Sequence, residues 1–190
     1  MLEGPRLRHP AAKGERNACL YRPAPRHQCR RHRLPTDGRA EGDCEGFGFA
    51  DVKTYIQSGN VLFRSDESEK AVEEKLDEAL GKKMGKQPGV MVRSRKELED
   101  IAANAPFPDA KPNFLLVYFL PEKAAGDALE KMVAPDGEEA KLAGREIYVH
   151  YPNGSGRSKL KLPALKPGTS RNLNTVRKLA EMAGEMEGRS

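Results

Sequence analysis

The most informative segment of this 190-residue chain is Asp51-Val52-Lys53-Thr54-Tyr55-Ile56-Gln57-Ser58-Gly59-Asn60-Val61-Leu62-Phe63. Apolar and polar residues alternate over residues 52–57, as they do in a half-buried β-strand. The turn cluster Ser58-Gly59-Asn60 follows, and its Gly and Asn tolerate positive φ angles. A second apolar run begins at Val61. The pattern predicts a β-hairpin and hence an antiparallel sheet.

Helical and strand-like patterns continue downstream of this hairpin. Val72, Leu76 and Leu80 recur every fourth residue, which predicts a helix over residues 67–84. Ser94 and Glu97 have the spacing of a capping box at the start of a further helix. Strands are expected at 89–93 and 114–120, a helix at 124–132, a second hairpin over 140–151 and a helix at 172–182. The chain therefore reads as α+β, with no visible internal repeat and a division near residues 111–112.

Composition excludes several classes of protein. No apolar run reaches the roughly 18 residues of a membrane span, and no secretory leader pattern opens the chain. Three scattered Cys exclude a disulfide framework. We therefore expect a cytoplasmic protein that is not embedded in a membrane.

The net charge of +5 belongs entirely to residues 1–43. This segment holds ten basic and five acidic residues, nine of the basic ones being Arg, whereas residues 44–190 hold 23 of each sign. Five Pro and the absence of any apolar period argue against helix or strand. The composition predicts that residues 1–43 are a disordered basic arm.

Residues of the types that hold a metal or an anion fall in two parts of the chain. Cys19, His27, Cys29 and His32 lack the tight pairs of a zinc site, so we predict no metal, and no cofactor motif is present. The polar stretches 153–159 and 169–175 are stronger candidates, because glycine-rich loops and helix N-termini attract anions. An ordinary loop and an ordinary helix cap remain the alternatives. Together with the hairpin turn, these stretches supply the candidate ligand-binding residues Ser58, Gly59, Asn60, Arg157, Ser158, Lys159, Arg171, Asn172, Asn174 and Thr175.

Four segments resemble the DUF1697 family, bacterial proteins of unknown function. They are residues 51–61, 144–152, 156–160 and 169–175, and they occur in the family's order. The resemblance covers about residues 44–184. It implies a ferredoxin-like N-terminal half over 44–110, with its first strand and helix missing or disordered, and a second small α+β subdomain over 111–190.

The family's opening strand and glycine loop have no counterpart in residues 1–43. However, residues 21–31 can be written in codons that, read one base later, give Ile-Ala-Leu-Leu-Arg-Gly-Ile-Asn-Val-Gly-Gly, which is the family's type of opening. Our hypothesis is that residues 1–43 are out of frame, through a frameshift or a sequencing error. A genuine basic arm is the alternative. Loss of a central strand would leave the chain poorly stable.

Three functions stay open at this stage. The first is binding of a small anionic or phosphate-bearing ligand by the polar loops, whether or not the protein is an enzyme. The second is nucleic-acid binding, which we consider unlikely because the basic balance vanishes after residue 43. The third is a non-functional product of a damaged gene.

Overall fold

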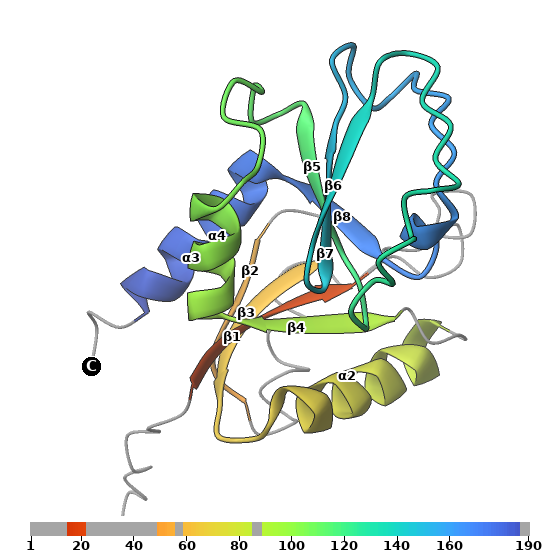
Figure 1. Cartoon of the computed structure of the whole chain (residues 1–190). Helices are drawn as coiled ribbons and strands as arrows, with labels where there is room; N and C mark the ends of the chain where they lie inside the picture. Colours follow the sequence, from red (N-terminus) through yellow and green to blue (C-terminus); the bar gives the residue numbers. More distant parts are fainter. Residues whose placement is uncertain (1–14, 22–48, 56–58, 85–88, 187–190) are drawn as a thin grey trace, which may run out of the picture.

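The described residues form two antiparallel sheets of four strands each, with helices packed against them (Figure 1). The computed structural model describes residues 15–21, 49–55, 59–84 and 89–186. Within this part of the chain, no helix is long and apolar enough to cross a membrane. The mixed content of helices and strands confirms the α+β prediction.

The first sheet has the order β2-β3-β1-β4. Its strands are β1 (Glu15–Tyr21), β2 (Ala50–Thr54), β3 (Asn60–Ser65) and β4 (Val90–Ser94). The β2–β3 pair is the predicted hairpin, and Gly59 takes a positive φ of 75° in its turn. Helix α2 (Glu69–Met84) packs Val72 and Leu76 against one face of this sheet.

The second sheet has the order β6-β7-β5-β8. Its strands are β5 (Leu115–Phe119), β6 (Glu139–Ala143), β7 (Glu146–His150) and β8 (Thr169–Asn172), and the short helix η1 (Pro163–Leu165) lies between β7 and β8. The apolar run predicted over 114–120 is the inner strand β5, hydrogen-bonded to both β7 and β8. The predicted hairpin over 140–151 is formed by β6 and β7.

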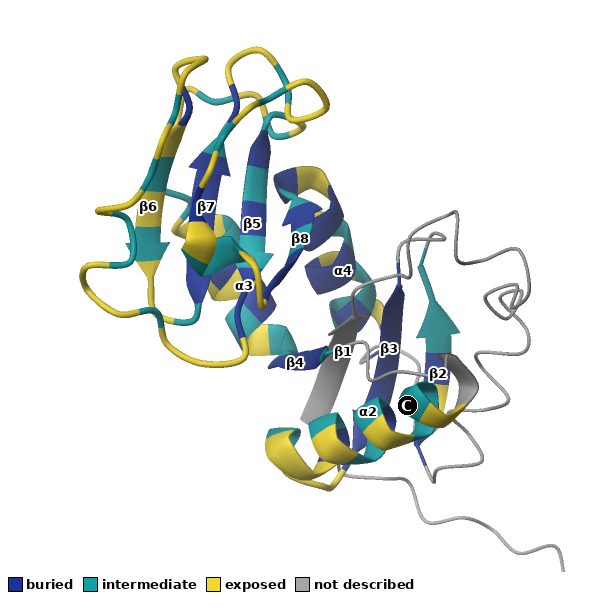
Figure 2. Cartoon of the chain, turned by 90° about the vertical axis from the view of Figure 1, so that its right-hand side faces the viewer, coloured by how far each residue is buried: buried dark blue, intermediate teal, exposed yellow. Residues whose placement is uncertain are grey.

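Helices α3 (Arg95–Ala103) and α4 (Leu173–Glu185) share one hydrophobic core with both sheets. Leu98 of α3 and Leu179 of α4 are fully buried in it, together with Leu62 of the first sheet and Val117 of the second. Strands β3, β4 and β7 are buried along almost their whole length (Figure 2). One core therefore joins the two sheets, and the opposite faces are covered separately by α2 and by the segments 124–132 and 160–165.

The two halves repeat one topology, although the sequence has no visible repeat. Strands β1 to β4 occupy the same places in their sheet as β5 to β8 do in theirs. Each half ends with a helix that follows its edge strand directly, α3 after β4 and α4 after β8. The repeat lies in the hydrogen-bonded topology, which can recur where the side chains differ.

Strand β1 corrects the prediction that the leader forms no regular structure. Glu15–Tyr21 lies between β3 and β4 and pairs antiparallel with both. The physical reason is that two strands flanking a gap carry backbone donors and acceptors that need partners. The rest of the predicted disordered leader, and the first helix of a ferredoxin-like unit, lie outside the described residues. The ferredoxin-like topology thus stays a prediction.

The helix predicted over residues 124–132 is absent from the described structure. That segment instead makes separate turns, with the Ala128 amide bonded to the Ala125 carbonyl and the Met132 amide to the Leu129 carbonyl. Gly126 lowers helix propensity near the segment's start, and each turn closes over three residues rather than four. Leu129 and Met132 still pack on the second sheet.

Candidate functional site

The structure separates the candidate residues into two groups. Gly59, Asn60 and Arg171 meet where the two halves join, whereas Arg157, Ser158 and Lys159 line a hollow beside the second sheet. Ser58 lies outside the described residues. The candidates therefore do not form one site.

Arg171 ties the second half to the first. It is buried, and its guanidinium donates to the Asn60 side-chain oxygen and, over 3.0 Å, to the Gly59 carbonyl. A further donation reaches the Thr169 hydroxyl at 2.8 Å. Since the side chain is enclosed by these partners, Arg171 holds the hairpin turn of the first sheet against β8 and does not present its charge to a ligand.

Arg93 makes the reciprocal contact from the first half to the second, and it was not among the predicted site residues. Its Nε donates to Glu146 over 2.8 Å and its Nη2 to the Leu120 carbonyl over 2.9 Å, with the side chain almost entirely buried. Arg93 precedes the Ser94 cap of α3 just as Arg171 precedes the Asn172 cap of α4. An Arg one residue before a helix-capping residue is the sequence signal that the two share and that could have identified both.

The predicted helix caps are structural. Ser94 and Glu97 form the expected capping box at the start of α3. The Asn172 side chain accepts from the Thr175 amide over 2.8 Å at the start of α4. Asn174 is exposed on that first turn, and Thr175 is buried. Asn172 and the Thr175 backbone amide are therefore explained by helix capping, without a bound anion.

A third arginine links the halves beside these caps. Arg145, in the β6–β7 turn, donates through Nη2 to Glu69 over 3.0 Å and to Glu97 over 2.6 Å. Burial raises the pKa of Glu69, and the neighbouring Glu97 raises it further. Burial also opposes ionisation of Glu97, but hydrogen bonds from Glu69, the Ser94 amide and Arg145 lower its pKa to about 2. Glu97 therefore has the lower pKa of the two carboxyl groups.

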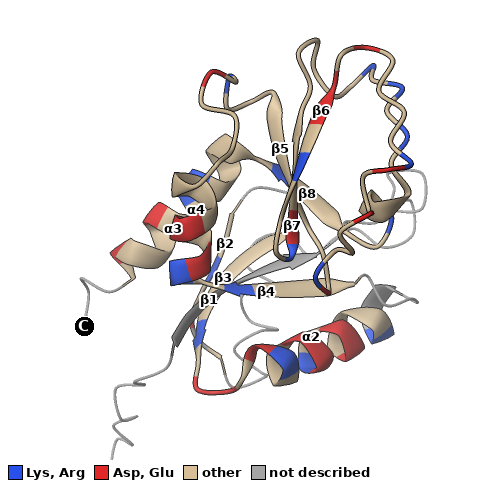
Figure 3. Cartoon of the chain, in the orientation of Figure 1, with Lys and Arg blue, Asp and Glu red and all other residues tan. Residues whose placement is uncertain are grey.

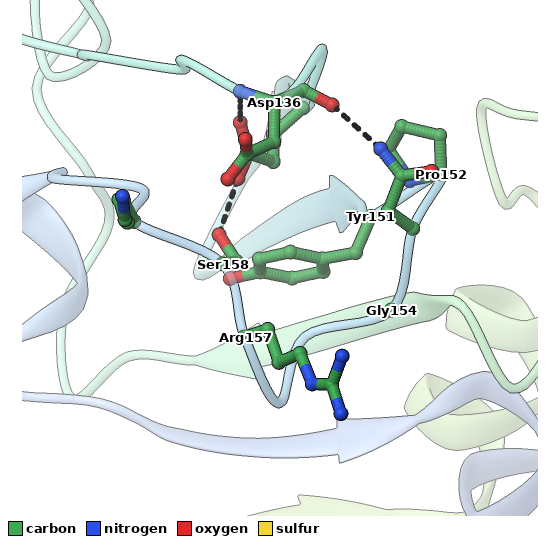
Figure 4. Close-up of a pocket in the computed structure, with 9 residues that line it drawn as sticks. Asp136, Tyr151, Pro152, Gly154, Arg157 and Ser158 are labelled. Atoms are coloured by element: carbon green, nitrogen blue, oxygen red, sulfur yellow. Dashed lines mark hydrogen bonds between the residues drawn. The ribbon is translucent and has the colours of Figure 1, made fainter.

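The hollow that retains exposed candidates has a volume of about 290 Å³ and lies between the chain entering β6 and the loop leaving β7. Figure 4 shows the Tyr151 ring between Asp136 on one side and Arg157 on the other. The residues lining it are Asp136, Glu138, Tyr151, Pro152, Asn153, Gly154, Arg157, Ser158 and Lys159.

Hydrogen bonds organise the floor of this hollow. The Ser158 hydroxyl donates to Glu138 and accepts from the Leu160 amide over 3.0 Å. The hydrogen bond from Ser158 lowers the pKa of Glu138, which is buried. Burial and the Tyr118 hydroxyl, 2.8 Å away, raise the pKa of Tyr151, so that phenol is neutral.

The acidic side of the hollow was not among the predicted site residues. Glu139 pairs with His150 at the end of the β6–β7 ladder, so extending that register brings residues 136–138 beside 151–153. The hairpin itself was predicted, and this extension is the signal that could have found them. In the described part of the chain, no three His, Cys, Asp or Glu side chains are grouped to hold a metal ion. Cys29, His27 and His32 lie outside the described residues.

Comparison with known proteins identifies relatives of unknown function. No curated protein matches. The solved structure of the conserved bacterial protein SP0830 from Streptococcus pneumoniae is similar in fold, with a TM-score of 0.69 and 20% sequence identity over 89% of this chain and 98% of that one. A model of the DUF1697 family, described as a protein of unknown function, matches residues 40–148, more than half of the sequence. The chain thus belongs to the DUF1697 family.

Proposed function

We propose that the protein binds a small anionic, phosphate-bearing ligand in the hollow lined by Arg157, Ser158 and Lys159. One observation carries this proposal. Arg157 and Lys159 are exposed at the rim of the same hollow, and neither makes an ion pair with any described residue. Two cations two residues apart on a loop with Gly154 and Gly156 can converge on one phosphate group.

The proposed site does not include the remaining candidate residues. Arg171 and Asn60 satisfy each other in the joint between the halves, and Asn172 caps α4. The hollow is at the small end of ligand pockets, which commonly span about 300–1,000 Å³. We therefore expect a ligand no larger than a short phosphate ester, held by a cytoplasmic protein.

The test is calorimetric titration of the 190-residue chain with inorganic phosphate, pyrophosphate and ethyl phosphate. We expect the double variant Arg157→Ala/Lys159→Ala to weaken binding at least about tenfold, since each charged hydrogen bond contributes roughly 1.5–3 kcal/mol. The matched control Lys123→Ala/Lys131→Ala removes two exposed cations elsewhere and is expected to bind normally. Absence of binding by the unaltered chain, or an equal loss in the control, would refute the proposal.

Nucleic-acid binding is the second candidate, and the described residues favour it less. Sheets that bind single-stranded RNA stack bases on exposed aromatic side chains. Phe63 is fully buried and Tyr55 packs against the shared core. Figure 3 shows acidic and basic residues interleaved along α2 rather than a basic face. Oligonucleotide binding that weakens steeply with salt would favour this candidate over the first.

The third candidate, a product of an out-of-frame gene start, concerns the first half only. The family match begins at residue 40, close to where the frame is proposed to resume. In addition, the register sets Asn17 opposite Phe63. Asn is an uncommon residue type for the middle of an inner strand. Sequencing of the locus from fresh DNA tests this candidate, and an intact frame through residues 1–43 would eliminate it.

A further inference from the structure

The hollow carries opposite charges that do not pair with each other. Asp136 belongs to the segment entering β6, and Arg157 and Lys159 belong to the loop after β7. None of these three side chains makes a hydrogen bond or ion pair with another described residue. Figure 4 shows Asp136 and Arg157 on opposite sides of the Tyr151 ring. The hollow therefore has a negative pole, Asp136, and a positive pole, Arg157 and Lys159, which do not contact each other.

The two carboxylates of the hollow differ in how they are engaged. Glu138 accepts from the Ser158 hydroxyl and, over 3.0 Å, from the Asp136 backbone amide. Its charge is thus satisfied internally. The Asp136 carboxylate has no such donors among the described residues and is exposed to the hollow. A ligand with a phosphate alone would leave this carboxylate unmatched and would be repelled by it.

We infer that the ligand carries an ammonium group as well as a phosphate, and this inference rests on the proposed function. Arg157 and Lys159 receive the phosphate, and Asp136 receives the ammonium across the neutral face of Tyr151. The uncharged tyrosine separates the two poles, because its high pKa keeps the phenol protonated. The ligand class is an aminoalkyl phosphate ester, which is dipolar like the hollow itself.

The experiment compares O-phosphoethanolamine with ethyl phosphate, which is nearly the same size and lacks only the ammonium group. Both are titrated into the 190-residue chain by calorimetry. We expect O-phosphoethanolamine to bind about threefold to fivefold more tightly, the range of a solvent-accessible ion pair. Asp136→Asn should remove this preference and leave ethyl phosphate bound at least as tightly as before. Asp127→Asn, an exposed site outside the hollow, is the control and should keep the preference.

The outcomes separate the two proposals. Equal binding of the two compounds by the unaltered chain, or a preference that survives Asp136→Asn, overturns the ammonium inference while the phosphate site stands. Failure of both compounds to bind overturns the phosphate site itself and the inference with it. Tighter binding of O-phosphoethanolamine that Asp136→Asn abolishes supports both. Circular dichroism of each variant verifies that the fold is retained.

Discussion

The inner strands β1 and β5 occupy the same place in their two sheets, yet their sequences differ in kind. β5 is Leu-Leu-Val-Tyr-Phe, with buried residues at alternate positions. β1 is Glu-Arg-Asn-Ala-Cys-Leu-Tyr, of which the first three residues are polar. Both are nevertheless bonded along both edges. An inner strand can therefore be specified by its neighbours, whose open edges require a partner, as well as by its own apolar pattern.

The largest expected loss of stability comes from breaking the buried Arg93–Glu146 ion pair between the halves. Arg93→Met leaves Glu146 buried without its cation, which costs about 3–5 kcal/mol in the free energy of unfolding. Adding Glu146→Leu to the same chain should recover much of that loss. Urea denaturation of the single and double variants measures the coupling, and additive losses would contradict a direct interaction.

Proline substitution tests whether β1 and β5 are equivalent. Ala18 pairs with Leu62 on one side and Arg93 on the other, and Val117 is flanked in the same way by Tyr148 and Arg171. Ala18→Pro and Val117→Pro should each destabilise the chain by about 3 kcal/mol or more, because proline removes a ladder donor. Thermal unfolding in which only Val117→Pro is destabilised would show that β1 is not an inner strand in solution.

A smaller loss is expected when the second tie is broken. Arg171→Met removes hydrogen bonds to the neutral Asn60 and Gly59 oxygens. We expect a loss of about 2 kcal/mol, below that of Arg93→Met. A loss by Arg171→Met that equals or exceeds it in the same denaturation series would contradict this ranking of the two ties.

The acid dependence of stability should be smaller still. The folded pKa of Glu97 is about 2 and its ordinary value is 4.5, so its contribution is present above pH 4.5 and is lost as the pH falls towards 2. Glu69, with a raised pKa, acts in the opposite direction, because its contribution is present below pH 4.5 and is lost as the pH rises through its folded pKa. Because both side chains are partly exposed, we expect the free energy of unfolding to change by only about 1 kcal/mol over this pH range. Glu97→Gln should flatten the unfolding free energy between pH 4.5 and 2, and an unchanged slope would contradict the assignment.

Local patterns in the sequence predicted much of the fold. The first hairpin, the Ser94–Glu97 capping box and the buried side of α4 follow from turn chemistry, cap spacing and helical periodicity. A helix was wrongly predicted over residues 124–132. The apolar residues of this segment do pack on the second sheet, but they are carried by successive turns. Strand β1 was missed because its ladder depends on β3 and β4, which lie far away along the chain.

The candidate site was predictable only in part. Arg157, Ser158 and Lys159 are adjacent along the chain, so one loop carries them together. Arg171 has the same chemistry in the sequence, but the approach of Asn60 from 111 residues away encloses it. Asp136 joins the hollow through the outward continuation of a hairpin register. Long-range packing thus decides which arginine is enclosed between the halves and which stays exposed.

The repeated topology also has a consequence for how the molecule can be divided. Arg93 reaches from the first half into the second and Arg171 reaches back, each contacting the opening residue of a strand in the opposite half, Glu146 or Asn60. The halves therefore make reciprocal arginine contacts, as two subunits of a symmetric dimer would. The chain behaves as an intramolecular dimer, and cutting it between α3 and β5 would strip each piece of the surface that completes its interior.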